Sequence, residues 1–231
     1  MEEIKYHENV ILLFADVCGY TKMCTEQSLQ VTVHVLNVLF TSFDELLEVH
    51  GVRQLNIIGD AYMAVEENTV NMLDFACAIL DKASKLNTNI KIGISSGPAV
   101  STTLGFVNKS RSYYGDTVNM ASRMESHGFP NTIHVTEAFI HRYADETAWT
   151  RMLDFKQLGV RQIKGKGEVQ TYVYCKSGEW ESAINANKYN SYHALENGSG
   201  PKNHSSFTYT GDANFRCGTT ISNSSSIPDS M

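Results

Sequence analysis

The chain has 231 residues, of which 42% are hydrophobic and 19% charged, so it can bury a sizeable core and is not disordered throughout. At about 150 residues per domain, this length fits one large domain, or one domain with a tail. The formal net charge of -6 argues against nucleic acid as a main partner, because proteins that bind a phosphate backbone present a basic face. The longest apolar run, Val10 to Ala15, is far shorter than the ~20 residues that span a bilayer, so we expect no membrane segment in this chain.

The cysteines and the N-terminus indicate the cellular compartment. The five cysteines are widely spaced and include no Cys-x-x-Cys pair, which favours reduced thiols over a disulfide framework or a zinc site. The first residues, Met1 to Ile4, lack the basic and apolar regions of a signal peptide. We therefore expect a cytoplasmic protein, or the cytosolic part of a larger membrane or sensor protein.

Composition divides the chain near residue 176. The last 55 residues contain 11 Ser, 7 Asn and 5 Gly, but only six Ile, Leu, Val or Phe. Such a segment buries too little apolar area to offset the entropy lost on ordering. The sequence thus predicts a domain over 1–176 and a mostly disordered Ser/Asn-rich tail over 177–231.

Strand-like and helix-like stretches alternate within the first 176 residues. Short apolar runs indicate strands, apolar residues three and four apart indicate helices, and Gly51 and the pair Gly59-Asp60 indicate a helix stop and a hairpin turn. This mixture of hairpins and helices argues for an α+β fold, with helices packed on an antiparallel-rich sheet. The predicted elements are, in chain order, a strand at 10–15, a helix at 26–50, strands at 52–58 and 61–65, a helix at about 73–83, strands at 90–95 and 98–106, a helix at about 117–127, a strand at 133–135, a short helix at 137–143 and a strand at 169–175.

Asp16 follows the first apolar run and precedes the segment Val17 to Thr21, which contains Gly19. A carboxylate at the end of a buried strand is destabilised unless something compensates its charge. Gly19 permits an unusual backbone turn, and free N–H groups at the start of the next helix can bind phosphate oxygens. The pattern also fits a helix-capping Asp in an ordinary strand-to-helix loop.

Asp60 lies at the tip of the predicted hairpin. Gly-Asp is an ordinary turn pair, so a turn alone explains this position. Two carboxylates on neighbouring strand ends, Asp16 and Asp60, could instead hold Mg²⁺, which prefers oxygen ligands and substrate phosphates. The number of residues between them leaves their distance open.

Polar residues on the third helix and in a glycine-rich turn form a second candidate group. Asn119 and Arg123 are four residues apart, so both side chains leave the same helix face, and Arg123 carries a cationic fork suited to phosphate. Lys164 and Lys166 alternate with glycines in a turn that could approach an anion. A solvated helix face and exposed turn lysines explain the same residues equally well.

Five motifs that occur in a fixed order along the chain are together specific for one protein family. The chain closely resembles the class III nucleotidyl cyclase catalytic domain, the family of adenylate and guanylate cyclases, over residues 8–176. The resemblance implies a ferredoxin-like α+β domain. The motifs are Phe14-Ala-Asp-Val-Cys-Gly-Tyr-Thr21, Ile58-Gly-Asp-Ala-Tyr-Met63, Gly93-Ile-Ser-Ser-Gly-Pro98, Gly115-Asp-Thr-Val-Asn-Met-Ala-Ser-Arg-Met-Glu125 and Lys164-Gly-Lys-Gly-Glu168.

The resemblance implies a site that binds two Mg²⁺ (or Mn²⁺) and a purine nucleoside triphosphate. Asp16 and Asp60 would bind the metals, with the Val17 carbonyl as a further ligand. The β- and γ-phosphates would be held by the backbone amides of Cys18, Gly19, Tyr20 and Thr21.

The resemblance also implies the rest of the mechanism and a dimer. Lys164 would meet the triphosphate, Asn119 would orient the ribose and Arg123 would stabilise the charged transition state as the 3′-hydroxyl attacks the α-phosphorus. The family's site lies between two catalytic domains, one supplying the metal residues and the other the remaining three. This chain has both sets, so the resemblance implies a homodimer, or a heterodimer with a related cyclase domain.

The positions that would read the base match neither standard pattern. Asn56 stands where guanylate cyclases carry Glu and adenylate cyclases carry Lys, and Ser112 stands where they carry Cys and Asp. Both residues can donate and accept hydrogen bonds, so they should discriminate poorly between the bases. The residues Gly115-Asp-Thr-Val-Asn119 are more similar to those of guanylate cyclases. This similarity favours GTP over ATP, although these residues do not contact the base. Lys91, where many relatives have Arg, is a milder departure.

Three functions remain open from the sequence. The first is an active purine nucleotide cyclase. The second is a catalytically silent cyclase-like module that binds nucleotide or pairs with a related domain, which the unusual Asn56 and Ser112 leave open. The third, a metal-dependent phosphohydrolase on a similar scaffold, would need neither the Asn119 and Arg123 pair nor the Lys164 turn, so it ranks last.

Overall fold

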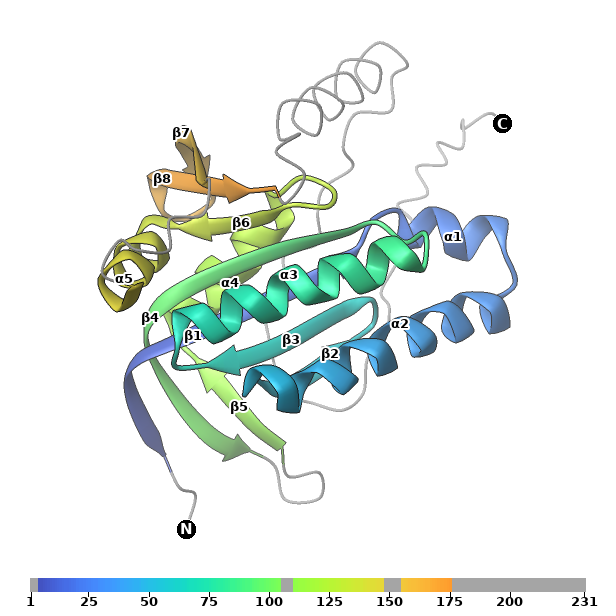
Figure 1. Ribbon diagram of the computed structural model, residues 1–231, viewed down its shortest axis with the longest axis horizontal. Helices are drawn as coiled ribbons and strands as arrows, with labels where there is room; N and C mark the ends of the chain where they lie inside the picture. Colours follow the sequence, from blue (N-terminus) through green and yellow to red (C-terminus); the bar gives the residue numbers. More distant parts are fainter. Residues whose placement is uncertain (1–3, 105–109, 148–154, 176–231) are drawn as a thin grey trace, which may run out of the picture.

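The computed structural model describes residues 4–104, 110–147 and 155–175 (Figure 1). The predicted tail over 177–231, and residues 105–106 of the strand predicted at 98–106, lie outside the described residues. No helix in the described ranges is long and apolar enough to cross a membrane. The elements are β1 Lys5–Val17, α1 Tyr20–Glu26, α2 Leu29–His50, β2 Arg53–Ile58, β3 Ala61–Glu66, α3 Thr69–Lys85, β4 Ile90–Leu104, β5 Ser110–Tyr114, α4 Asp116–Ser126, β6 Ile133–Thr136, α5 Glu137–Thr147, β7 Phe155–Ile163 and β8 Gly167–Tyr174.

The strands form one sheet in the order β2-β3-β1-β4-β6-β8-β7, and β5 pairs with β4 outside this path. In the part of the chain that the structure describes, β4 and β6 run parallel and the other paired strands run antiparallel. This arrangement confirms the predicted α+β class with an antiparallel-rich sheet.

Alternation along β1 divides the core between the two faces of the sheet. Ile11, Leu13 and Ala15 pack with apolar residues of α2, α3 and α5, whereas Leu12 packs with Ala121 of α4 on the other face. Figure 1 shows α2 and α3 across the near face and α4 behind the sheet. Because side chains alternate along a strand, the even-numbered positions of β1 lie on the α4 face.

The helix predicted over 26–50 begins at Leu29 in the structure, and the separate short helix α1 precedes it. α1 ends at Glu26, and α2 begins at Leu29 behind Ser28, whose hydroxyl accepts a hydrogen bond from the N–H of Val31 at 3.4 Å. A serine in this position satisfies one of the free N–H groups of the first turn and fixes where the helix starts. The predicted end is correct, because Gly51 takes a left-handed conformation with φ 67°.

α4 lies unusually close to the sheet. A Cβ atom at Gly93 of β4 would overlap the backbone of α4 at Ala121 and Glu125, so only glycine is compatible with this packing. At the other end of the helix, the Thr117 hydroxyl donates to the Pro98 carbonyl at 2.7 Å. These contacts fix α4 against β4 along most of its length.

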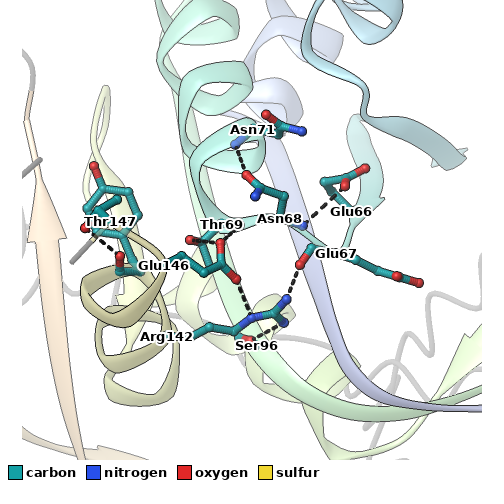
Figure 2. Close-up of polar contacts among 10 residues, drawn as sticks. Glu66, Glu67, Asn68, Thr69, Asn71, Ser96, Arg142, Glu146 and Thr147 are labelled. Atoms are coloured by element: carbon teal, nitrogen blue, oxygen red, sulfur yellow. Dashed lines mark hydrogen bonds and ion pairs between the residues drawn. The ribbon is translucent and has the colours of Figure 1, made fainter.

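A polar network joins α5 to the end of β3 and the start of α3 (Figure 2). Arg142 donates to Glu146 at 2.7 Å, to Ser96 at 3.3 Å and to the Glu67 carbonyl, while Glu146 accepts from the N–H and hydroxyl of Thr69 at 2.7 and 2.6 Å. Since the predicted site residues lie near the beginning of β3, this network is at the opposite end of that strand.

The strand predictions differ from the structure in two ways. The strands predicted at 90–95 and 98–106 form the continuous β4, which passes through Pro98 opposite an irregularity in β1 between His7 and Val10. Bulges of this kind accommodate a proline that cannot donate to the ladder. β5 and β7 were not predicted, because each is rich in polar or exposed residues and shows no apolar run.

Candidate active site

Asp16 and Asp60 meet at one end of the sheet. Asp16 is the penultimate residue of β1 and pairs with Ala61, the first residue of β3, while Asp60 occupies the turn that leads into β3. The two side chains lie close enough for each to shift the pKa of the other. Gly59, with φ 62°, allows the turn that brings Asp60 to this position. The structure therefore gives the proximity that the sequence left open.

The ionised form of both carboxyl groups is disfavoured, because the pKa of each is raised. Burial raises the pKa of Asp16, and the nearby carboxylates of Glu125 and Asp60 raise it further. Burial also raises the pKa of Asp60. Two half-buried carboxylates that repel one another would both be stabilised by a bound cation.

The donor chemistry at this pair suits Mg²⁺ or Mn²⁺. The donors at the pair are carboxylate oxygens of Asp16 and Asp60. Among the described residues, there is no cluster of three or more His, Cys, Asp or Glu that would enclose a metal by itself. Mg²⁺ is typically bound by one or two carboxylates, with water and substrate phosphates completing its shell, so the residues fit such an ion.

Lys91 and Glu125 form a second charged pair beside the carboxylates. The Lys91 ammonium lies 3.2 Å from the Glu125 carboxylate, and the two side chains are only 23% and 13% exposed. Lys91 pairs directly with Asp16 across β1 and β4, and its charge partly offsets the rise in the pKa of Asp16. Sequence reasoning did not assign Glu125 a role and treated Lys91 only as a departure. The glycine at position 93, which admits the end of α4, was the available signal.

The loop from Val17 to Thr21 only partly matches the predicted phosphate-binding segment. Gly19 has φ 75° and precedes α1, which begins at Tyr20. The Cys18 N–H already donates to the Asn89 carbonyl at 2.9 Å, so it is engaged within the fold. Burial raises the pKa of the Cys18 thiol to about 11, which keeps it protonated and makes it a poor nucleophile.

Asn119 and Arg123 project from α4, and Arg123 approaches the turn between β7 and β8. Asn119 is exposed and Arg123 is partly buried. A Cβ atom at Gly165 would lie 3.6 Å from Arg123 Nη2, so glycine leaves room for the guanidinium. The Arg123 Nη1 atom is buried without a hydrogen-bond partner in the described structure. A buried cationic donor without a partner is a candidate for binding an anion.

Lys164 opens the same turn, and its neighbour Lys166 pairs with Asp116 at the first turn of α4. Within the described residues, Lys164 is exposed and has no acidic partner. The structure thus places Asn119, Arg123 and Lys164 on adjoining segments. In the part of the chain described, none of the three forms a hydrogen bond or ion pair with Asp16 or Asp60.

The residues expected to contact the base lie on β2 and β5. Asn56 is exposed at an irregularity in β2, and its side chain accepts from the Ile57 N–H at 2.9 Å. Ser112 pairs with Thr102 in the β4–β5 arm. One side-chain contact joins the two strands, since Arg53 Nη2 lies 3.5 Å from the hydroxyl of Tyr113, the residue next to Ser112.

Comparison with known sequences gives a consistent result. A family model described as the adenylate and guanylate cyclase catalytic domain matches residues 2–176. The germination-specific adenylate cyclase of Dictyostelium discoideum is 32% identical over 180 residues, which are 71% of this chain and 20% of that protein. The soluble guanylate cyclase subunit beta-2 of Rattus norvegicus is 31% identical over 179 residues, 71% of this chain and 26% of that protein. The chain therefore spans about a fifth to a quarter of the length of these relatives.

Comparison with solved structures identifies a similar domain. The guanylate cyclase domain of RhGC from Catenaria anguillulae, solved in complex with GTP, has a TM-score of 0.67 and 29% sequence identity. The similarity covers 74% of this chain and 97% of that domain. The shared region is therefore essentially a whole catalytic domain.

Proposed function

Because this chain belongs to the family of adenylate and guanylate cyclase catalytic domains, we propose that it is a purine nucleotide cyclase of intracellular signalling. It would convert a nucleoside triphosphate into the 3′,5′-cyclic monophosphate and pyrophosphate. The observation that carries the proposal is the half-buried pair Asp16 and Asp60, whose raised pKa values and oxygen donors suit divalent cations. We place the reaction in the cytoplasm, in this chain alone or in the cytosolic part of a larger protein.

Asp16 and Asp60, with the Val17 carbonyl, would hold two Mg²⁺ or Mn²⁺ ions. Such ions supply positive charge to the triphosphate and make the 3′-hydroxyl easier to deprotonate. Lys91 and Glu125 lie directly beside the carboxylates and would keep them in place. Phosphate oxygens would be bound by the amides that follow Cys18 at the start of α1.

The remaining residues would act on the nucleotide through hydrogen bonds and charge. Asn119 would orient the ribose, Lys164 would bind the triphosphate and Arg123 would stabilise charge that develops on the transferred phosphorus. The ribose O3′ would form a bond to the α-phosphorus as the bond to the pyrophosphate oxygen breaks, and the O3′ proton would leave to solvent. This step needs positioning and charge neutralisation rather than a covalent enzyme intermediate.

We propose that the active form is a homodimer, with a heterodimer as the other arrangement. The proposal is supported by the lack, among the described residues, of any hydrogen bond or ion pair from Asn119, Arg123 or Lys164 to the two carboxylates of the same chain. Each site of a symmetric dimer would combine the carboxylates of one protomer with the α4 and turn residues of its partner. An isologous dimer of one chain would then carry two complete sites.

We propose GTP rather than ATP as the preferred substrate, with weak discrimination. Asn56 and Ser112 are neutral and can each donate or accept, so neither base leaves a strongly unfavourable unpaired group. The same two residues are the observation that favours the second candidate, a catalytically silent module that binds nucleotide or pairs with a related domain.

The test is direct measurement of product. Purified protein at high concentration is incubated with GTP or ATP and with Mg²⁺ or Mn²⁺, and cyclic nucleotide and pyrophosphate are quantified. We expect cyclic GMP in excess of cyclic AMP. If neither cyclic GMP nor cyclic AMP forms under any of the four conditions while nucleotide binding is retained, the result would instead support the silent module.

A further inference from the structure

The turn that carries Lys164 has little internal hydrogen bonding to fix its conformation. It is a tight connection between β7 and β8 in which the Lys166 N–H donates to the Ile163 carbonyl at 2.9 Å. Gly165 and Gly167 both have φ 73°, a conformation that only glycine adopts without strain. A turn with two such glycines has considerable conformational freedom, so the position of Lys164 must be fixed by contacts outside the turn.

Three of these contacts come from α4. Ile163, the last residue of β7, is 2% exposed and packs with Met120 and Met124 of the helix. Arg123, one helical turn from Met120, lies against Gly165. The side chain of Lys166 pairs with Asp116 in the first turn of α4. The turn is therefore attached to the helix by an apolar contact, a close approach and an ion pair.

The ion pair and the proposed substrate-binding residues lie along one side of α4. Asp116, Asn119 and Arg123 are three and four residues apart, a spacing that places their side chains on neighbouring positions of the same helix face. Lys166 thus pairs at one end of this row, while Gly165 is placed against Arg123 at the other. Because Lys166 is paired with Asp116, the described turn leaves Lys164 as its cation without an acidic partner.

We propose that Asp116 and Lys166 are positioning residues, whose ion pair sets Lys164 at the place where it binds the triphosphate beside Arg123. This inference rests on the proposed nucleotide cyclase function and adds a residue pair to its phosphate-binding side. The pair is exposed, with side-chain exposure of 58% for Asp116 and 34% for Lys166, so its net contribution to the free energy of unfolding is small. Its main effect is on the geometry of the turn.

Four variants test the pair by their effect on KM for the nucleotide. Lys166→Gln and Asp116→Asn should each raise KM about threefold to fivefold, in keeping with the strength of an exposed ion pair, and leave kcat within about twofold. The double variant should be no worse than either single variant, because both remove the same contact. Asp116→Glu, which keeps the charge, should recover most of the affinity.

The chain offers a closely matched control. Lys82 and Glu45 form an ion pair at 3.2 Å between α3 and α2, with side-chain exposures of 36% and 63%. Lys82→Gln removes one positive charge from an equally exposed pair on the other face of the sheet, and KM should remain unchanged. This control separates a local effect on the turn from an effect of overall charge.

The direction in which Asp116→Asn changes KM shows whether Lys166 positions the turn or binds phosphate directly. If Lys166 itself bound phosphate, removal of Asp116 would free its charge, and KM would fall or stay the same while Lys166→Gln raised it. That pattern would overturn the proposal. So would a lowered melting temperature in both variants with KM and kcat per folded molecule unchanged, since the pair would then serve stability alone.

A second measurement does not depend on turnover. Amide hydrogen exchange of residues 163–167 in nucleotide-free protein should accelerate in Lys166→Gln and Asp116→Asn but not in Lys82→Gln, and equal rates in all proteins would overturn the proposal. If the wild-type protein forms no cyclic product, the proposed function fails. The positioning role is then decided by the same exchange rates and by the calorimetric Kd for GTP with Mn²⁺, which should rise threefold to fivefold in both variants.

Discussion

Asp16 and Asp60 are brought together by the backbone and not by attraction between their side chains. β1 and β3 pair so that the two carboxyl groups share one end of the sheet, and burial there raises both pKa values. A folded protein that retains two mutually repelling, half-buried carboxylates has a site that gains free energy from binding a cation.

The first prediction concerns Asp60→Asn. This change should abolish cyclic nucleotide formation, because one of the two metal-binding carboxylates is lost. It should also leave the metal-free protein at least as stable as wild type, since a half-buried carboxylate whose pKa is raised by burial is replaced by a neutral amide. Product assays and urea denaturation in EDTA measure the two effects. Asp145→Asn, an exposed change on α5, is the control, and an active Asp60→Asn protein would refute the metal assignment.

The second prediction concerns the base. Asn56→Glu together with Ser112→Cys should raise the ratio of kcat/KM for GTP over ATP by roughly tenfold or more, because a carboxylate accepts from the two donors of guanine and leaves adenine unpaired. Initial rates with both nucleotides provide the ratio. A higher relative rate with ATP would show that these two residues do not face the base.

The third prediction concerns His134, a fully buried residue of β6. Its Nδ1 atom donates to the Met124 carbonyl at 2.7 Å, and burial lowers its pKa to about 4, below the ordinary value of 6.5. The unfolded chain therefore binds a proton that the folded chain does not, between about pH 6.5 and pH 4. The free energy of unfolding should fall by up to about 1.4 kcal/mol per pH unit over this range.

Urea denaturation between pH 7.5 and pH 4.5 tests the role of His134. His134→Asn keeps a donor for the Met124 carbonyl and cannot take up the proton. The variant should be less stable than wild type at neutral pH because it is smaller, and its stability should depend less steeply on pH. Parallel slopes for the two proteins would contradict the assignment.

Among the helices and strands, those with a buried apolar face could be predicted from the sequence, and exposed ones could not. The core strands and the helices α2, α3 and α4 were predictable because their apolar residues recur with a clear period. β7 was not, because it is an edge strand with exposed residues such as Val160 and Lys156, and nothing in its pattern marks a buried face. The start of α2 was predicted three residues too early, because Ser28 is also an acceptable residue on a helix surface.

The candidate site was predictable in composition but not in geometry. The motifs indicated Asp16, Asp60 and the α4 residues, yet no pattern in the sequence states how near two strand ends lie. The pair Lys91 and Glu125 depends on the close approach of α4 at Gly93, which is a property of the packed structure. The engaged Cys18 amide likewise depends on the position of Asn89, more than seventy residues along the chain.

The fourth prediction concerns the network around Arg142. Glu146→Gln would weaken the contacts with Arg142 and Thr69 that join α5 to the start of α3, and should lower the free energy of unfolding by about 1–3 kcal/mol. Because the network lies at the far end of β3 from Asp60, kcat and KM well below the melting temperature should not change. Lost activity with unchanged stability would contradict this assignment.

At the scale of the whole molecule, the sheet separates stability from the proposed chemistry. The large apolar cluster with α2, α3 and α5 fills one face. The candidate residues lie at one end of the sheet and on the α4 face, where a smaller apolar cluster supports the helix. A domain built in this way can present its site to a second domain without exposing its main core.

The close packing of α4 at Gly93 has a consequence for the proposed dimer. Glu125, near the end of this helix, lies beside the carboxylates of its own protomer, whereas Asn119 and Arg123 would serve the partner's site. One rigid helix would then contribute to two sites at once, so nucleotide bound at one site should change the affinity of the other, with reciprocal coupling. Equilibrium titration with GTP and Ca²⁺ should give a Hill coefficient different from one. Gly93→Ala, by pushing the helix off β4, should bring that coefficient toward one as it weakens binding.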